Sequence, residues 1–168
     1  VGARGRRGII VEASLKLLPL PVAEARLSKP CESLGQAEEL LETIWASDLQ
    51  PIVLDLHRND GGPLTLVIGF AGPRADVEAQ SGNANALGFT DVTLLDYDGR
   101  FRRTTSHFTS VAPGNLVSML QTLGVEPFVA RAGNGVIYHA SAKPSKLPSP
   151  DLQKRVKEMF DPEGVISG

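Results

Sequence analysis

The fold is decided by the stretch PIVLDLHRNDGGPLTLVIGF, residues 51–70. It contains two apolar segments, Pro51 to Leu56 and Leu64 to Phe70, each with the length and composition of a buried β-strand. Between them, residues 59–62 read Asn-Asp-Gly-Gly, and residues of these types tolerate the positive φ angles of a tight turn. The stretch therefore predicts a β-hairpin.

A helix is predicted on either side of this hairpin. Before it, Ser33 and Gln36 have the spacing of a capping box. The following segment places apolar residues on one face of a helix, namely Leu34, Ala37, Leu40, Leu41, Ile44 and Trp45. That helix should run to about Ser47. After the hairpin, Pro73 is expected at the first position of a second helix, which Gly82 weakens.

Further elements extend this pattern along the chain. Strands are expected at Gly8 to Leu18, Ala23 to Leu27 and Val92 to Leu95, which gives the element order of a ferredoxin-like unit. The second half repeats the order in part, with a strand, a helix, two strands and a final helix at Thr109 to Ala112, Asn115 to Leu123, Pro127 to Ala130, Val136 to Ala140 and from Ser149 onwards. We therefore predict an α+β, ferredoxin-like fold, in which a mostly antiparallel sheet has helices packed on one face and consists of two related β-α-β-β-α units.

The composition excludes several classes of protein. The chain has 168 residues and a single cysteine, Cys31, so no internal disulfide can form, which favours the reducing environment of the cytoplasm. No apolar run approaches the roughly 20 residues that span a bilayer. The 17 basic residues are balanced by 19 acidic ones. We therefore expect neither a membrane span nor nucleic acid as a partner.

Few residues have the spacing of a catalytic or metal site. The histidines His57, His107 and His139 lack the i, i+4 spacing of a ligand pair, so no metal site is predicted. His57 is expected to end a strand and face solvent. Cys31 lies just before the capping box, where a buried or incidental thiol is the simpler interpretation. Tyr138 and His139 are a better candidate site, because adjacent strand residues point to opposite faces and only one of them need be structural.

Three motifs together resemble one protein family. They are GRRGIIVEASLKLLP at residues 5–19, AGNGV at 132–136 and LQKRVKEMFDPEGVISG at 152–168. In this order they are similar to the C-terminal part of FAD-linked oxidases of the vanillyl-alcohol-oxidase type, most of all to the FAD-binding subunit of glycolate oxidase. The resemblance implies that residues 1–20 end a flavin-binding domain, and that residues 21–168 form a C-terminal, substrate-side α+β domain.

The resemblance also implies a cofactor and partners. FAD would be bound by an intact parent protein whose flavin-binding domain precedes Val1, so we do not expect the chain alone to retain it. In the family, the backbone at the positions of Gly8, Ile9 and Ile10 lies near the flavin, and the turn around Asn134 faces the active site. The expected partners are the upstream FAD-binding domain, other oxidase subunits and a small 2-hydroxy-acid substrate.

The reaction implied by the resemblance is oxidation of the CH–OH group of a 2-hydroxy acid. A cation must hold the substrate carboxylate, and the planar fork of Arg131 suits its two oxygens. His139 is the candidate base for the hydroxyl proton, because an unperturbed imidazole has a pKa of about 6.5. Related dehydrogenases place a metal-binding histidine where this chain has Arg131, so no metal is carried over. The alternative is structural: Arg131 pairs with a surface carboxylate, and His139 packs under the final helix.

Two hypotheses for the function follow. One is the substrate-side domain of a flavin-dependent, glycolate-oxidase-like oxidoreductase, in which case the isolated chain is inactive. The other is a non-catalytic ferredoxin-like module that binds a small ligand or another subunit, because the same fold serves both. A flavin-domain reading frame upstream of Val1 would favour the first hypothesis.

Overall fold

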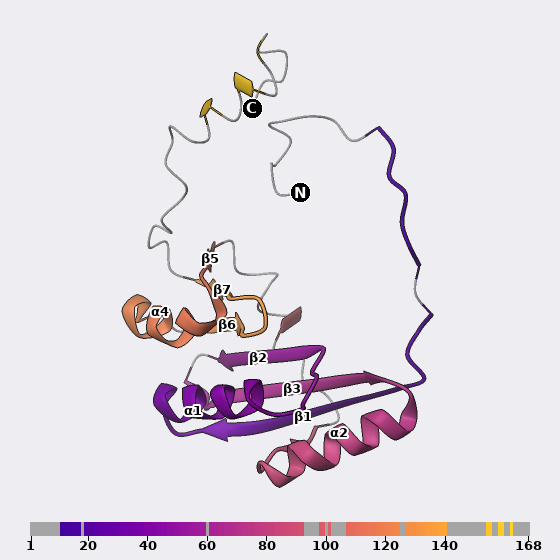
Figure 1. Ribbon diagram of the computed structural model, residues 1–168. Coiled ribbons are helices and arrows are strands. Elements are labelled where there is room, and N and C mark those ends of the chain that lie inside the picture. Colours follow the sequence, from indigo (N-terminus) through magenta and orange to yellow (C-terminus); the bar gives the residue numbers. More distant parts are fainter. Residues whose placement is uncertain are drawn as a thin grey trace. The chain divides into compact units, whose positions relative to one another are not determined.

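The computed structural model describes residues 11–17, 19–59, 61–92, 98–99, 101, 107–124, 127–140, 154–155, 158–159 and 162. The chain divides into two compact units, Leu20–Lys143 and a second one made of Val1–Pro19 and Pro144–Gly168. The first unit contains the sheet and its helices (Figure 1). In the second unit, residues 154–155 and 158–159 are helical, and the rest of the helix predicted from Ser149 onwards lies outside the described residues.

The first unit consists of two halves that follow each other along the chain. The first half contains β1 (Ala23–Cys31), α1 (Leu34–Trp45), β2 (Val53–Arg58), β3 (Leu64–Gly72), α2 (Arg74–Ala86) and β4 (Thr90–Asp91). The second half contains β5 (His107–Ser110), the short 3-10 helix η1 (Pro113–Asn115), α4 (Leu116–Leu123), β6 (Phe128–Arg131) and β7 (Val136–His139).

The strands form one antiparallel sheet (Figure 1). Among the described residues it has seven strands in the order β4-β1-β3-β2-β6-β7-β5, and each neighbouring pair is antiparallel. The first half has the β-α-β-β-α-β order of a ferredoxin-like unit. The second half repeats this arrangement in reverse across the sheet, so that β6, β7 and β5 correspond to β2, β3 and β1. The predicted α+β, ferredoxin-like fold is confirmed.

One face of the sheet packs against α1, α2 and α4. Strand residues such as Leu27, Leu56 and Ile68 form a single buried cluster with Leu41 of α1 and Leu120 of α4, and α2 contributes its two buried residues to the same cluster. Full burial of a leucine stabilises a fold by about 1.5–3 kcal/mol. This face therefore holds the two halves of the sheet and the helices together.

The helix boundaries follow the sequence signals with two differences. Ser33 caps α1 as predicted, and its hydroxyl accepts a hydrogen bond from the Gln36 N–H at 3.2 Å. The Gln36 side chain, however, accepts from the N–H of Glu32 at 2.7 Å, where a capping box would use the N–H of Ser33. Pro73 is the N-cap residue of α2, one position before the predicted one. This helix continues through Gly82 because tertiary packing of its buried face outweighs the low propensity of glycine.

One predicted strand differs from the structure, and a second is described only at its first residue. Of the strand predicted at Gly8 to Leu18, residues 11–17 form neither helix nor strand, and the Val11 and Leu17 side chains are 94% and 87% exposed. A segment with an apolar pattern forms a strand only where a neighbouring strand can pair with its backbone N–H and C=O groups. Residues 8–10 and 18 lie outside the described residues. Of the strand predicted at Val92 to Leu95, only Val92 is described; it follows β4, which ends at Asp91, and its N–H donates to the carbonyl oxygen of Arg26 at 3.0 Å. Residues 93–95 lie outside the described residues.

Replacing Gly135 by alanine should lower the free energy of unfolding by about 3 kcal/mol, the combined cost of backbone strain and a steric clash. Gly135 has a φ of 71°, and an added Cβ would collide with the carbonyl oxygen of Val111. The matched control is Gly82→Ala in α2, where the new Cβ meets nothing within 4 Å and should stabilise the helix by about 1 kcal/mol. Urea denaturation measures both variants. Equal effects of the two substitutions would contradict this account of the β6–β7 turn.

Candidate functional site

The other face of the sheet carries polar side chains, and we call it the polar face. The members that matter here are Asp55 and His57 of β2, Thr65 of β3, Arg131 of β6 and Tyr138 of β7. The strand register shows that they share one face, because Asp55 lies opposite Arg131, and Val129 lies opposite both His57 and Tyr138. Asp55, His57 and Thr65 are all buried. Burying polar groups costs free energy unless they are paired, so this concentration of them marks a candidate site.

Arg131 lies between two carboxylates on this face. One guanidinium nitrogen, Nη1, donates to Oδ2 of Asp55, and the other, Nη2, donates to Oδ2 of Asp98. The Asp55 side chain is 3% exposed, whereas those of Arg131 and Asp98 are 22% and 30% exposed. The structure thus contains the pairing expected in the structural alternative, with one buried and one partly exposed carboxylate. The role of Arg131 as a clamp for a substrate carboxylate stays a prediction.

His57 lies on the polar face two residues after Asp55, and it is 5% exposed. The expectation that it faces solvent is therefore wrong. Its strand lies in the middle of the sheet, with β3 on one side and β6 on the other, and Phe101 forms a buried apolar cluster with Val67 and Val129 on the same face. Burial lowers the pKa of His57 to about 4, because desolvation disfavours the charged imidazolium. The ring is consequently neutral at pH 7.

His139 lies on the helix-covered face, opposite to that of Arg131. In the register it faces Phe128 of β6, and Phe128 points to the same side as the buried core. The ring is 1% exposed, its Nε2 lies 3.2 Å from Oγ1 of Thr109, and it stacks on the ring of His107 with 6.3 Å between centroids. The two predicted catalytic residues are therefore not brought together. Of the adjacent pair Tyr138 and His139, Tyr138 shares the face of Arg131.

The predicted cofactor-binding residues are placed only in part. Gly8, Ile9 and Ile10 lie outside the described residues. Asn134 lies in the exposed turn between β6 and β7, where its Oδ1 accepts a hydrogen bond from the Val136 N–H at 3.2 Å and shapes the turn. Cys31 is buried, and burial raises the pKa of its thiol, which disfavours the reactive thiolate.

The described residues contain neither a cluster of metal-ligating side chains nor a helix that could cross a membrane. In the ranges that the structure describes, no three histidine, cysteine or acidic side chains are grouped as metal ligands would be. Within the same ranges, none of the helices combines the length and apolar character that crossing a bilayer requires.

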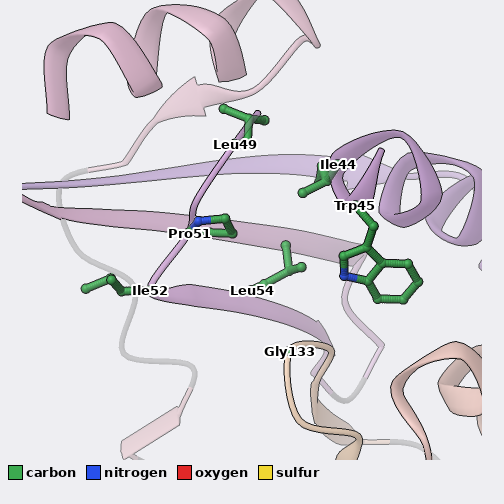
Figure 2. Close-up of a pocket in the computed structure, with 7 residues that line it drawn as sticks. All are labelled: Ile44, Trp45, Leu49, Pro51, Ile52, Leu54 and Gly133. Carbon is green, nitrogen blue, oxygen red and sulfur yellow. The ribbon is translucent and has the colours of Figure 1, made fainter. Parts of the chain in front are cut away.

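An apolar pocket of about 290 Å³ lies away from the polar face (Figure 2). It opens between the end of α1, the segment that leads into β2 and the β6–β7 turn, and it is lined by Ile44, Trp45, Leu49, Pro51, Ile52, Leu54 and Gly133. Leu54 belongs to the helix-covered face, since it is part of the main buried cluster. The lining has no charged side chain, so this pocket offers no partner for a carboxylate.

Sequence reasoning identified Arg131 but not its partners. Asp55 and His57 alternate with the apolar residues Leu54 and Leu56 in one strand, and this i, i+2 spacing is a usable signal that two polar side chains share a face. Asp98, in contrast, follows β4 in a segment without periodicity. Only the tertiary structure shows that it reaches Arg131.

The α+β fold is similar to that of part of a solved structure, alkyldihydroxyacetonephosphate synthase, with a TM-score of 0.57 and 15% sequence identity. The match covers 98% of this chain and 45% of that one, so the chain spans less than half the length of this structural relative. At this identity the likeness shows the fold alone. No protein-family model and no curated protein sequence matches the chain.

The two carboxylates on Arg131 should differ in their contribution to stability. Asp55→Asn should lower the free energy of unfolding by about 3 kcal/mol, because it removes the charge of a buried ion pair. Asp98→Asn, the matched control, should cost less than about 1 kcal/mol, because water already screens that pair. Guanidinium chloride denaturation at pH 7 measures both. If Asp98→Asn lowers the free energy of unfolding as much as Asp55→Asn does, the distinction between a buried ion pair and one screened by water is wrong.

Stability should fall in mild acid because of His57. A histidine in the unfolded chain has a pKa of about 6.5, and burial lowers that of His57 to about 4. Between pH 6.5 and pH 4, His57 binds a proton in the unfolded chain but not in the folded one. The free energy of unfolding is therefore unaffected by His57 above about pH 6.5 and decreases as the pH falls below it. The loss approaches about 3 kcal/mol at pH 4. Denaturation at a series of pH values should show a shallower slope in His57→Gln, and an identical slope in both proteins would contradict the assignment to His57.

Proposed function

We propose that the chain is the C-terminal, substrate-side domain of an FAD-dependent oxidoreductase that acts on the CH–OH group of 2-hydroxy acids, similar to glycolate oxidase. Two findings support this proposal. The fold likeness covers nearly the whole chain but less than half of a larger member of the FAD-linked oxidase family. The three sequence motifs resemble the same family. In this proposal, residues 1–20 end the flavin-binding domain, which is the main partner of residues 21–168.

The observation that carries the proposal is the position of Arg131. The guanidinium projects from a central strand, is anchored by a buried carboxylate and keeps 22% of its side-chain surface accessible. A rigid, partly exposed guanidinium is well suited to orient a small carboxylate, because its N–H groups can pair with both carboxylate oxygens. We propose that Arg131 holds the substrate carboxylate and so fixes the position of the neighbouring α carbon.

The described residues fit a place at the edge of an FAD site. Asn134 lies in an exposed turn, and its side chain uses its oxygen to shape that turn, so its amide nitrogen is the group that would donate to a cofactor. Among the described residues, no helix begins with a glycine-rich phosphate loop. The dinucleotide would accordingly be held by the upstream domain, with Gly8, Ile9 and Ile10 near the flavin. When bound, FAD supplies the hydride acceptor.

The hydroxyl proton needs a base, and two histidines are candidates. His139 is the residue that the sequence favours, but it lies on the face opposite to Arg131. His57 shares the face of Arg131; its lowered pKa keeps the ring neutral at pH 7 but also makes it a weak base, so its strength would have to rise when substrate binds. A substrate whose carboxylate contacts Arg131 would therefore lie on the same face of the sheet as the His57 ring and on the opposite face from the His139 ring.

The alternative is a non-catalytic module that binds a small ligand or another subunit. The observation that favours it is the apolar pocket at Trp45 and Ile52, whose side chains are 45% and 65% exposed (Figure 2). Apolar, concave surfaces of this size commonly take small ligands. The two proposals differ in the coding sequence upstream of Val1, where only the first requires a flavin-binding domain.

The proposed function is tested with the full-length protein encoded by that reading frame. It should purify with FAD and reduce an electron-accepting dye in the presence of glycolate or another 2-hydroxy acid, whereas the 168-residue chain alone should purify without flavin. Absence of a flavin-domain reading frame, or a full-length flavoprotein that oxidises no 2-hydroxy acid, would overturn the proposal.

In the full-length protein, Arg131→Lys should raise KM for 2-hydroxy acids about tenfold, because it retains the charge but loses the two-pronged geometry. Substitution of the base by Gln should lower kcat by about 10²-fold to 10⁴-fold with little change in KM. Comparing His57→Gln with His139→Gln assigns the base. Steady-state kinetics unchanged in all three variants would remove these residues from the active site.

A further inference from the structure

The apolar pocket at the end of α1 has the size of a small-molecule site (Figure 2). Its volume of about 290 Å³ lies at the lower end of the range for such sites, roughly 300–1,000 Å³, so it has room for one ring or a short branched chain. Gly133 contributes only backbone to the lining, and a Cβ added there would meet no atom within 4 Å. The β6–β7 turn therefore leaves its side of the pocket open.

Two large apolar side chains at this pocket remain in contact with water. Trp45 is 45% exposed and Ile52 is 65% exposed, and they stand at opposite ends of the lining in Figure 2. The lining residues Ile44 and Leu54 are buried and belong to the main core. Removing apolar surface from water stabilises a complex. The apolar body of a ligand would therefore be stabilised by contact with all four side chains.

Negative charge lies beside the pocket on the side of α1. Glu42 precedes Trp45 at the i, i+3 spacing that places two side chains on the same helix face, and Asp48 directly precedes Leu49. Both acidic residues are exposed, and neither forms an ion pair with a residue that the structure describes. The last turn of α1 carries no basic residue to offset the negative end of the helix dipole. Residues 32–57 contain no lysine or arginine at all.

The other elements at the pocket do not neutralise this charge. Arg131, the basic residue next to the β6–β7 turn, lies on the polar face, where its guanidinium donates to Asp55 and Asp98. α2 reaches the segment before β2 through the uncharged side chain of Gln80. The charges beside the pocket are therefore acidic, which attracts a cation and repels a carboxylate.

We propose that this pocket binds a small organic cation, in which an ammonium group is attached to an aromatic or branched aliphatic body. The body fills the apolar pocket, and the ammonium group stays at its mouth, close to the indole ring of Trp45 and to Glu42 and Asp48. An ammonium group on the face of an indole ring is a favourable cation–π contact. This site is separate from the polar face and does not depend on the proposed reaction, whose 2-hydroxy-acid substrates are anions.

Fluorescence of the 168-residue chain tests the inference, because Trp45 is the only tryptophan in the sequence. The probes are phenylethylammonium, phenylethanol and phenylpropionate, which share one ring and are positive, neutral and negative at pH 7. Phenylethylammonium should bind about fivefold to tenfold more tightly than phenylpropionate at low salt, with phenylethanol between them. The difference should shrink in about 1 M salt, where screening acts within about 3 Å.

Two variants should remove the preference for the ammonium probe. Ile52→Lys adds a positive charge at an exposed position of the lining, and Glu42→Gln combined with Asp48→Asn removes the acidic side chains. The double variant should bind phenylethanol as the unsubstituted chain does. The matched control is Val22→Lys, which adds the same charge at another exposed apolar position, before β1, and should keep the preference.

Each contrary result would overturn the inference. Equal affinity for the three probes, or a preference that survives both Ile52→Lys and the double variant, would show that the acidic side chains select no cation. Unchanged Trp45 fluorescence and an unchanged amide resonance of Gly133, at the highest soluble concentration of every probe, would show that the pocket binds none of them. Trp45 fluorescence that depends on protein concentration without a probe would show that a second copy of the chain occupies the pocket. The flavin-dependent reaction is tested separately, on the full-length protein.

Discussion

Antiparallel pairing of β2 with β6 joins the two halves of the sheet, and the rest of the structure depends on it. Four cross-strand pairs, from Asp55 with Arg131 to Arg58 with Phe128, make this seam. Because antiparallel neighbours point to the same side, the seam places Leu56 and Ala130 in the core and Asp55 and Arg131 on the polar face. A shift of one residue would exchange the faces, so burial of the core also fixes the contact between the two charges.

The two faces of the sheet have separate roles. The helix-covered face supplies stability through its apolar cluster, and His139 belongs to that environment. In the part of the chain that the structure describes, the polar face has a small apolar cluster, around Val67, Phe101 and Val129, beside its buried polar groups. Asp55 and His57 are buried on the central strand β2, and Asp55 is paired there with Arg131. Such residues on rigid central strands are well placed to orient a ligand, because the backbone around them has little freedom.

The sequence was sufficient to predict most elements of the first unit. Ser33 and Gln36 cap the first turn of α1, and the Asn-Asp-Gly-Gly segment connects the two strands of one hairpin. Both signals involve residues close together in the sequence, so the elements that they define can be predicted from the sequence. The strand at Gly8 to Leu18 could not be judged in this way, because strand formation depends on a partner that no local pattern specifies. The same limit applies to His57, which the sequence places at the end of a strand but whose burial results from β3, β6 and Phe101 around it.

For the candidate site, the sequence by itself determined the kinds of chemical group and the alternation that assigns Tyr138 and His139 to opposite faces. That alternation is a property of every strand and needs no neighbour. Only the tertiary structure decided which face meets Arg131, that Asp55 and Asp98 pair with it, and that His57 is neutral. Register, burial and long-range ion pairs depend on residues far apart in the chain, and the 76 residues between Asp55 and Arg131 contain no local signal that they meet.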